Sequence, residues 1–446
     1  MAKLKCLACT IVAALVFFAC SADTLAQDEA PLLTLVEAVH LAEAHNRQLS
    51  IASLGASGAN NIADAAATHF LPVLKLSAVT ADQMSPVNVH FPAGSLGTAA
   101  DGTLLPQKSI DLTAAAGVNT LISVTAAQPI TQIEKIRAQI NVEKIAAATA
   151  VVQVRAMRSA VVFKTEDTYY NVVTDCELLK SAEAAEAWNQ QMCKQVRSAL
   201  AAGTALRADL MSATAALANS QADVSRFVGQ QRIDKMKLNE TLGRSLTTQF
   251  TVSLAACALP MIPEAEADHN PTVEAALLFA DQAQQKKRVI TAGYWPDISL
   301  ALSYYQLTTA VAGLPSKVVL VGLQASWDPF DWGERRLEAR AADAAFRAAK
   351  VAYRDALAQH EIAIATARQS INDVEMYVRA ARLAADAADE GLRVATNEYR
   401  VSAVPLSRLL EAHKRDISAQ ADLVTARLAV LRAQNALSLQ LGSTTP

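Results

Sequence analysis

The sequence has few cysteines, few aromatic residues and no strong excess of one charge. Aromatic residues make up 5% of the 446-residue chain, and the cysteines beyond residue 26 (Cys176, Cys193 and Cys257) show no CxxC spacing. They predict neither a disulfide framework nor a redox pair. The net charge is −3 and the isoelectric point is near 6.2, so no nucleic-acid partner is expected. A chain that is 52% hydrophobic, rich in alanine and poor in aromatic residues is typical of a mostly helical protein.

Long apolar runs and catalytic motifs are also missing. Beyond the N-terminus, no uninterrupted apolar stretch reaches the ~20 residues of a membrane-spanning helix. His360-Glu361 lacks the second histidine of a zinc-protease motif, and no phosphate-binding loop, nucleophile elbow or calcium loop is present. The histidines are scattered rather than clustered. The sequence therefore predicts no enzyme, no cofactor and no metal site.

Residues 1–26 are predicted to be an export signal. Lys3 and Lys5 form its positive end, and a short apolar core follows. Two processing routes remain open: ordinary cleavage after Ala26, or a lipoprotein-like cleavage that leaves a lipidated Cys20. Ordinary cleavage is favoured because a phenylalanine stands three positions before Cys20. Either route takes the protein out of the cytoplasm.

Two segments, 298–304 and 318–327, alternate apolar residues with small or polar ones. This period of two predicts strands with one apolar face, as in a barrel wall with lipid outside and water inside. The alternative is a soluble hairpin on a core. The flanks favour the membrane, because long helical sequence surrounds the strands and aromatic residues gather at the junction, as in the girdles of membrane interfaces (Tyr294, Trp295, Trp327, Phe330 and Trp332).

The same unit occurs twice in the chain. Asn46 precedes Pro72 by the same interval as Asn270 precedes Pro296, and each proline has an aromatic residue two positions before it and a predicted strand after it. The end of the first copy, Leu-Asn-Glu-Thr-Leu-Gly, matches Leu-Ser-Leu-Gln-Leu-Gly at the end of the second. Motifs at matching offsets predict an internal duplication.

Each copy is predicted to run helix–strand–strand–long helix–short helix. The copies span 34–243 and 270–442, joined by a connector at 244–269 that carries Pro260 and Pro263. In the first copy we expect a helix at 32–69, a strand at 73–80, a long outer loop at 82–118 and a second strand at 120–128. Two further helices should follow at 131–200 and 206–242.

Apolar residues recur every seven positions along the long helices. Leu357, Ile364, Ile371 and Val378 form one such series in a predicted helix over 333–400. This spacing predicts a coiled-coil seam, and the many alanines allow close helix packing. Without the strands, the simplest interpretation would be a non-transporting periplasmic coiled-coil scaffold.

These features together resemble the TolC-type outer-membrane efflux channels. The resemblance rests on the export signal, the duplicated hairpins, Gln128-Pro129, and the run Trp-Asp-Pro-Phe-Asp-Trp-Gly at 327–333. It implies a mainly α fold with a transmembrane β portion: a long α-helical barrel and a 12-stranded β-barrel to which each chain of a homotrimer gives four strands. Four strands cannot close a membrane barrel alone, which independently indicates several chains.

The resemblance also implies partners and a role. It implies an outer-membrane exit duct for small molecules in a tripartite pump, working with a periplasmic adaptor protein and an inner-membrane transporter. The exit duct of a type I protein secretion system is the alternative, and the sequence does not name the substrate.

The functional positions implied by the resemblance lie at the two helical turns farthest from the strands. The adaptor-contacting tips would be Gly203, Thr204, Ala205 and Leu206, with Ser402, Ala403, Val404, Pro405 and Leu406. The periplasmic aperture would be formed by Asp209, Arg408 and Glu411. The family usually has glycine where Ser402 stands and an acid where Arg408 stands, so a simple carboxylate ring is in doubt. The alternative is that Asp209, Arg408 and Glu411 are only solvated helix residues.

Overall fold

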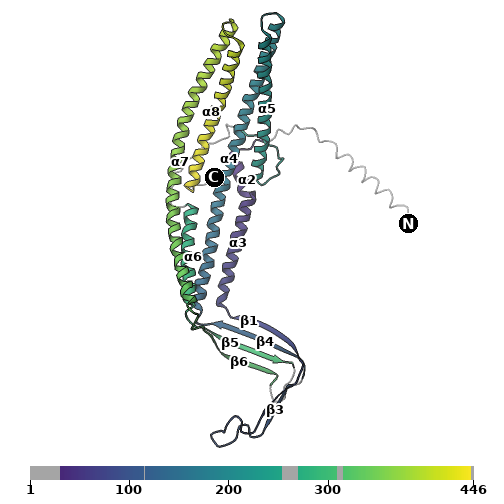
Figure 1. Ribbon diagram of the computed structural model, residues 1–446, viewed down its shortest axis with the longest axis vertical. Coiled ribbons are helices and arrows are strands. Elements are labelled where there is room, and N and C mark those ends of the chain that lie inside the picture. Colours follow the sequence, from purple (N-terminus) through teal and green to yellow (C-terminus); the bar gives the residue numbers. More distant parts are fainter. Residues whose placement is uncertain (1–30, 115, 254–269, 309–314, 443–446) are drawn as a thin grey trace, which may run out of the picture.

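A computed structural model describes residues 31–114, 116–253, 270–308 and 315–442. The molecule is long and narrow, with a layer of helices at one end and a sheet at the other (Figure 1). The predicted export signal, Cys20 and most of the predicted connector lie outside the described residues.

Seven α-helices form the helical part of the described chain. They are α2 (Leu35–His45), α3 (Arg47–Ala67), α4 (Ile133–Ala201), α5 (Arg207–Thr241), α6 (Pro271–Ala292), α7 (Glu334–Arg400) and α8 (Leu406–Gln440). Nearest the sheet they form a layer in the order α3, α4, α6, α7, and farther away α4 pairs with α5 and α7 with α8 (Figure 1). Among the described helices, α4 alone has an 18-residue window long and apolar enough to cross a membrane by composition, but it packs against α3, α5, α6 and α8.

Four antiparallel strands form the main sheet in the order β1 (Val73–Gln83), β4 (Gly117–Pro129), β5 (Asp297–Leu307) and β6 (Lys317–Ser326). The central pair joins the two sequence copies, because β4 comes from the first and β5 from the second. Among the described strands, β1 and β6 each have one neighbour, so the sheet of a single chain is open on both sides.

The two faces of this sheet differ as the alternation predicts. Leu76, Val124, Tyr304 and Val319 are cross-strand partners and share one face. The other face carries hydroxyl pairs, such as Ser77 Oγ and Ser123 Oγ at 2.7 Å and Thr125 Oγ1 and Ser303 Oγ at 3.3 Å.

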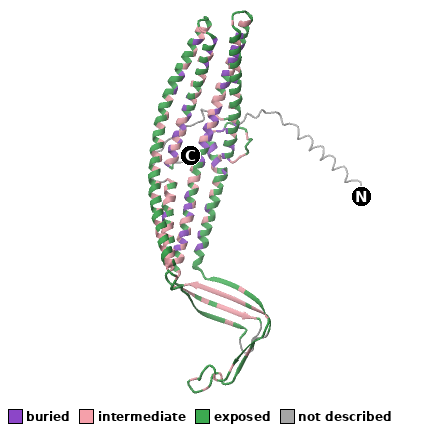
Figure 2. Ribbon diagram, in the orientation of Figure 1, coloured by how far each residue is buried: buried purple, intermediate pink, exposed green. Residues whose placement is uncertain are grey.

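None of the described helices covers the apolar face of the sheet. Leu74, Leu76 and Val321 are 72%, 70% and 70% exposed, and the strands lie beyond the end of the helices rather than beneath them (Figure 2). A soluble hairpin would bury these side chains against a core. The exposed apolar face is the arrangement of a membrane-barrel wall.

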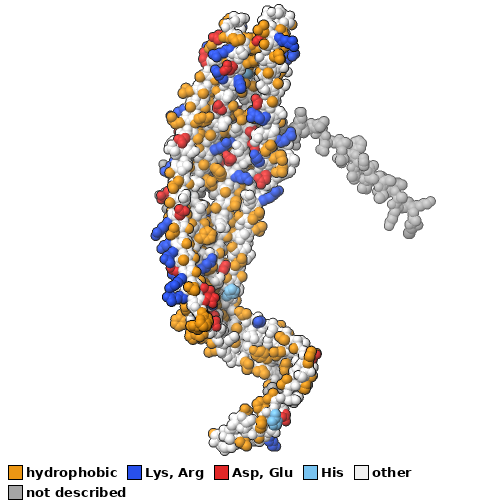
Figure 3. Space-filling model, viewed as in Figure 1, with side chains coloured by type: hydrophobic (Ala, Val, Ile, Leu, Met, Phe, Trp, Pro, Cys, Tyr) orange, Lys and Arg blue, Asp and Glu red, His pale blue; other side chains and the backbone are white. Residues whose placement is uncertain are grey.

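Exposed aromatic residues mark the junction between helices and strands. Trp295, Trp327 and Trp332 are exposed there, and the rings of Phe330 and Trp332 meet edge to face with centroids 4.8 Å apart. Hydrophobic side chains gather visibly at this level in Figure 3. Trp and Tyr favour the membrane–water interface, so the junction corresponds to the edge of the bilayer.

Two predictions about the first copy were wrong. The segment 32–69 is not one helix, because Asn46 has an extended backbone (ψ 126°) and its side chain accepts hydrogen bonds from the N–H groups of Gln48 and Leu49, which begins α3. The segment 82–118 is not only a loop: it holds β2 (Val87–Phe91) paired with β3 (Ile110–Ala114). Its many prolines and glycines concealed the period-two alternation of β2.

Each copy is closed by the same hydrogen bond. Asn46 Nδ2 donates to the carbonyl oxygen of Thr241 at the end of α5, at 2.8 Å, and Asn270 Nδ2 donates to Gln440 at the end of α8, at 3.2 Å. Both asparagines also cap the helix that they begin. One side chain therefore ties the start of the helix that leads into the first strand to the end of the last helix in each copy, which explains the matching offsets in the sequence.

The turn after α5 leaves no room for a side chain at Gly243. Its φ is 69°, and a Cβ there would lie 2.1 Å from the carbonyl oxygen of His45. We expect Gly243→Ala to lower the melting temperature of the detergent-purified protein or prevent its assembly, because the left-handed backbone alone costs about 1–2 kcal/mol.

Gly229, inside α5, is the matched control. Apart from its chain neighbours and the backbone of its own helix, no described residue has an atom within 4 Å of the place that a Cβ would take there, so Gly229→Ala should stabilise the helix by up to ~1 kcal/mol. Equal melting temperatures for the two variants would show that the turn at Gly243 is not tight.

Candidate functional site

The two predicted tips lie together at the end of the molecule farthest from the sheet (Figure 1). The first connects α4 to α5 and the second connects α7 to α8. Gly203 and Ser402 occupy equivalent places, with φ of 76° and 58°. In each, the next residue closes the turn, since Thr204 N–H donates to Ala199 and Ala403 N–H donates to Glu398, both at 2.9 Å. Ser402 thus adopts the left-handed backbone that glycine usually supplies at the end of a helix.

Asp209 has a structural role in the first tip. Its carboxylate accepts a hydrogen bond from the N–H of Leu206 at 3.0 Å, which caps the start of α5. It also lies close to Tyr399 on the other hairpin: burial raises the pKa of the Tyr399 hydroxyl, and the negative charge of Asp209 raises it further. Asp209 therefore caps α5 and acts electrostatically on a residue of the other hairpin, while its place in an aperture stays a prediction.

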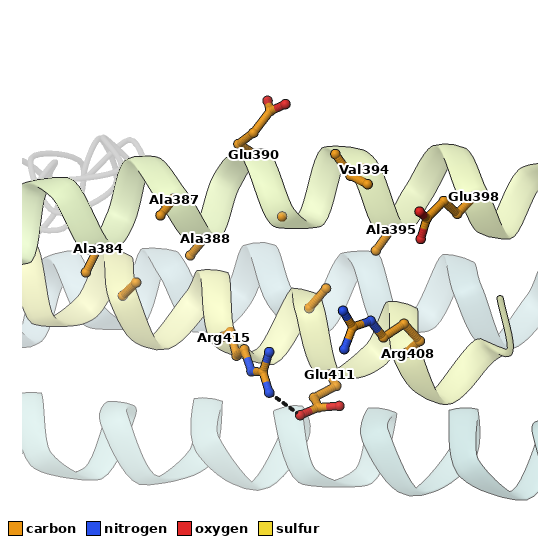
Figure 4. Close-up of a pocket in the computed structure, with 13 residues that line it drawn as sticks. Ala384, Ala387, Ala388, Glu390, Val394, Ala395, Glu398, Arg408, Glu411 and Arg415 are labelled. Atoms are coloured by element: carbon orange, nitrogen blue, oxygen red, sulfur yellow. Dashed lines mark hydrogen bonds and ion pairs between the residues drawn. The ribbon is translucent and has the colours of Figure 1, made fainter.

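Arg408 and Glu411 line a groove of about 690 Å³ between α7 and α8 (Figure 4). One wall is α7, which contributes small side chains such as Ala384, Ala388 and Ala395. The charged side chains at its edges come from both helices: Glu390, Glu398, Arg408, Glu411 and Arg415. Because the alanine side chains are small, they leave an open groove beside these charges.

Glu411 does not pair with Arg408 within the chain. Its carboxylate forms an ion pair with Arg415, one turn farther along α8 (Figure 4). Within the described part of the chain, Arg408 has no ion pair, and its side chain is exposed. Glu411 and Arg415 are four residues apart, the spacing that brings two side chains together on a helix.

An apolar cluster joins the two hairpins behind the groove. It contains Met192, Cys193 and Val196 of α4 with Leu406 and Leu409 of α8. Beside it, the rings of Trp188 and His413 stack with centroids 3.7 Å apart. Local patterns did not indicate this stack, because its partners belong to different copies.

His413 is held in its neutral form. Burial lowers its pKa to about 4, and neither ring nitrogen has a hydrogen-bond partner among the described residues. A protonated imidazole here would be a buried charge against an apolar cluster. Elsewhere, the described residues include no group of three or more His, Cys, Asp or Glu side chains placed to hold a metal ion.

The stack should make stability depend on pH. An unfolded histidine has a pKa of about 6.5, so the unfolded state binds a proton first as pH falls. The stability that neutral His413 contributes is complete above that pH and is lost progressively towards pH 4. We expect the melting temperature of His413→Phe, which keeps a ring on Trp188, to fall less between pH 7.5 and pH 5 than that of the wild type.

His40→Phe is the control for this comparison, because His40 is exposed on α2. Thermal unfolding in detergent at several pH values gives the difference in melting temperature between each variant and the wild type. Parallel curves for the wild type and His413→Phe would show that His413 is not buried in a neutral state.

Several solved structures of outer-membrane proteins have a similar fold, and a search of curated proteins found no match. VceC of Vibrio cholerae has a TM-score of 0.74 and 17% identity, covering 92% of this chain and 96% of that chain. CmeC of Campylobacter jejuni, an outer membrane channel, has a TM-score of 0.76 and 16% identity over 92% and 85%. The open state of MtrE of Neisseria gonorrhoeae has a TM-score of 0.75 and 16% identity over 92% and 89%. At these sequence identities, the similarity shows a shared fold.

The family is shown by the sequence itself. A family model described as outer membrane efflux protein matches residues 38–244 and 262–443, one segment for each copy of the repeat. Three features of the structure agree with this match: the open sheet with its apolar face, the exposed aromatic residues where helices meet strands, and the two helical tips. The chain belongs to the outer membrane efflux protein family, whose members are channels of the outer membrane rather than enzymes.

Proposed function

We propose that the chain is one of three subunits of an exit duct that carries small molecules out of the cell. An inner-membrane transporter would supply the energy, and a periplasmic adaptor protein would hold the two together. The observation that carries the proposal is the open four-stranded sheet: its apolar face suits lipid, but β1 and β6 each lack a neighbour on one side. Backbone groups left unpaired in hydrocarbon cost several kcal/mol each, so neighbouring chains must pair these edges.

The two outer sides of the helical layer lie next to the two open edges of the sheet along the chain. α3 and α7 are its first and last members, and each exposes large apolar side chains at helical spacing. On α3 these are Ile51 and Leu54, 70% and 72% exposed, and on α7 they include Val351, which is 63% exposed. Because α3 leads into β1 and α7 follows β6, one neighbouring chain could cover a helical flank and a sheet edge together.

Three copies would give a barrel of twelve strands, as the family resemblance implies. In this trimer the groove residues Arg408, Glu411 and Arg415 would occur three times around the periplasmic entrance. Adaptor contacts are proposed for the tip residues 203–206 and 402–406. The duct itself would be passive, since moving a substrate along it needs no catalytic group. A protein-secretion duct would share this geometry, so the inner-membrane partner recovered by crosslinking distinguishes the two roles.

The assembly can be tested by mass. The detergent-purified particle should have about three times the mass of one chain by light scattering. Leu54→Glu should disrupt the trimer, because it would place a charge in the proposed contact between α3 of one chain and α7 of the neighbouring chain. Val36→Glu, at an exposed position on α2, should leave the trimer intact. A wild-type protein that is stable as a monomer would refute the proposal.

The entrance can be tested by conductance in planar bilayers. Arg408→Glu brings a second negative charge near Glu411 and Glu398, and each exposed like-charge contact costs up to ~1 kcal/mol. Three such sites should weaken the closed state and raise single-channel conductance, most at low salt, where screening is least.

Lys414→Glu makes the same charge change on an exposed residue of α8 that does not line the groove. It should leave conductance close to that of the wild type. If both variants behave alike, or if Arg408→Glu changes nothing, the constriction lies elsewhere and the groove charges are ordinary surface residues.

A further inference from the structure

The side of the helical layer that faces water inside the duct can be located from contacts with the sheet. Two side chains at the start of α4 reach the hydroxyl-bearing face of β5: Lys135 Nζ lies 3.4 Å from the Asp297 carboxylate, and Gln132 Nε2 donates to Ser299 Oγ at 3.4 Å. A groove of about 380 Å³ lies there, between the first turns of α4 and the last turns of α6, and Arg288 of α6 lines it. Arg288 therefore marks the water-facing side of α6.

The helical layer and the sheet are fixed to each other at this level. The hydroxyl of Thr131, at the start of α4, donates to the carbonyl of Pro296 at 2.7 Å and accepts from the N–H of Ile298 at 2.8 Å. Ile130 N–H donates to the carbonyl of Ile298 at 2.9 Å. These bonds form a rigid floor for the helices, so the water-facing side of the sheet continues into one side of the helical layer.

The packing of α6 against α7 extends this side to α7. The two helices are antiparallel neighbours, and such a pair has an approximate two-fold axis normal to the layer. Because each residue turns a helix by about 100°, positions with the same offset from the contact residues lie on the same side of both helices. On α6, Arg288 directly follows Lys287, whose ammonium reaches Asp343 of α7 at 2.7 Å. On α7, the residues that directly follow the half-buried contact positions lie on the side of Arg288.

These following positions are almost all basic. The half-buried contact positions of α7 are 339, 342, 346, 349 and 353. The residues after them are Arg340, Asp343, Arg347, Lys350 and Arg354, and Arg336 stands one turn before Arg340. We call the exposed bases among them, Arg336, Arg340, Arg347, Lys350 and Arg354, the basic stripe. Asp343 is the one acid in this row, and it is engaged by both Lys287 and Arg347.

Charge is segregated across this part of the layer. Apart from Arg347, the bases of the stripe have no ion pair within the described part of the chain. Glu338 directly precedes a contact position and Glu334 lies one turn before it, so both acids point to the outer side. On the water-facing side of α6, Arg288 is balanced by the exposed Asp281. Lys and Arg side chains line the edge of the molecule along the sheet-proximal part of α7 (Figure 3).

The proposed trimer would bring three such stripes into one lumen. Twelve helices that lie 8–10 Å apart would form a ring about 30–40 Å across between helix axes. Arginine and lysine side chains reach inward from that ring, so a solute on the axis would lie within about two Debye lengths of the charges, one length being ~8 Å at physiological salt. The stripes would therefore act on every solute that passes this level.

We propose that the basic stripe makes the duct selective for anions, and that the small molecules it carries are organic anions with carboxylate, sulfonate or phosphate groups. Arg and Lys side chains line anion-selective pores, and a channel lined by one sign of charge concentrates the opposite sign. Exposed, flexible side chains attract an anion along the whole stripe without holding it at one place, which suits passage. This inference rests on the proposed exit duct and adds the charge of its substrate.

The experiment measures the ion selectivity of the full-length, detergent-purified protein in planar bilayers. The reversal potential in a potassium chloride gradient gives the ratio of chloride to potassium permeability, and potassium benzoate then replaces the chloride to test an organic anion. We expect the wild type to prefer both anions over potassium. Arg340→Glu should lower the anion-to-potassium ratio roughly twofold or more. The change should be larger at 0.1 M than at 1 M salt, because the Debye length falls from ~10 Å to ~3 Å.

Lys286→Glu is the matched control. It makes the same charge change on the neighbouring helix, and Lys286 is exposed on the outer side because it directly precedes Lys287. Its permeability ratio should equal that of the wild type. If Arg340→Glu does not form trimers, Arg354→Glu repeats the test about four turns farther along the same stripe.

Two results would overturn the anion selectivity while leaving the duct intact. One is a conducting wild-type trimer that prefers potassium over chloride and benzoate. The other is the same permeability ratio in Arg340→Glu and Lys286→Glu, which would show that the stripe does not face the lumen. A wild-type particle that forms no channel would instead overturn the exit duct itself, and the inference with it.

Discussion

Backbone groups in hydrocarbon must find hydrogen-bond partners within the protein, and this constraint shapes the whole molecule. The main sheet pairs its strands in the order β1-β4-β5-β6 and leaves the outer edges of β1 and β6 open. Those two strands are continuous with α3 and α7, the two ends of the helical layer. The same chain segments therefore define the free sides of both layers. Any neighbour that closes the sheet also meets the apolar flank of a helix, so pairing in the membrane and packing in the periplasm are coupled.

A second constraint acts within each copy. The helices are long, so each copy needs a fixed point that holds their ends in register. Asn46 and Asn270 provide one each, because an asparagine that caps a helix can also donate to a carbonyl left free at another helix end. Gly243 completes the first of these sites by letting the turn approach His45. The duplicated sequence thus repeats a specific contact as well as an order of elements.

The two ends of the molecule use charge differently. At the tips, charged side chains stand over a groove walled by alanine, and the hairpins meet through the apolar cluster beside His413 and Trp188. Contacts of this kind can separate without exposing a large core. At the membrane end, the basic side chains beside Trp295 stand on a floor locked by Thr131. A rigid base and a loosely joined entrance suit a duct that is anchored at one end and contacts partners at the other.

Local patterns in the sequence determined much of this protein. Period-two alternation placed β5 and β6, matching offsets revealed the duplication, and the glycine and proline positions located the tips. They failed at Asn46, where a cap interrupts a helical pattern, and at β2 and β3, where turn residues hid a hairpin. The tertiary structure alone decided which surfaces meet: Asn46 with Thr241, Trp188 with His413, and α4 with α6 around Arg288. These partners lie more than a hundred residues apart. Periodicity assigns a side chain to a face of its own helix, but only the packing of the helices decides which other side chain that face meets.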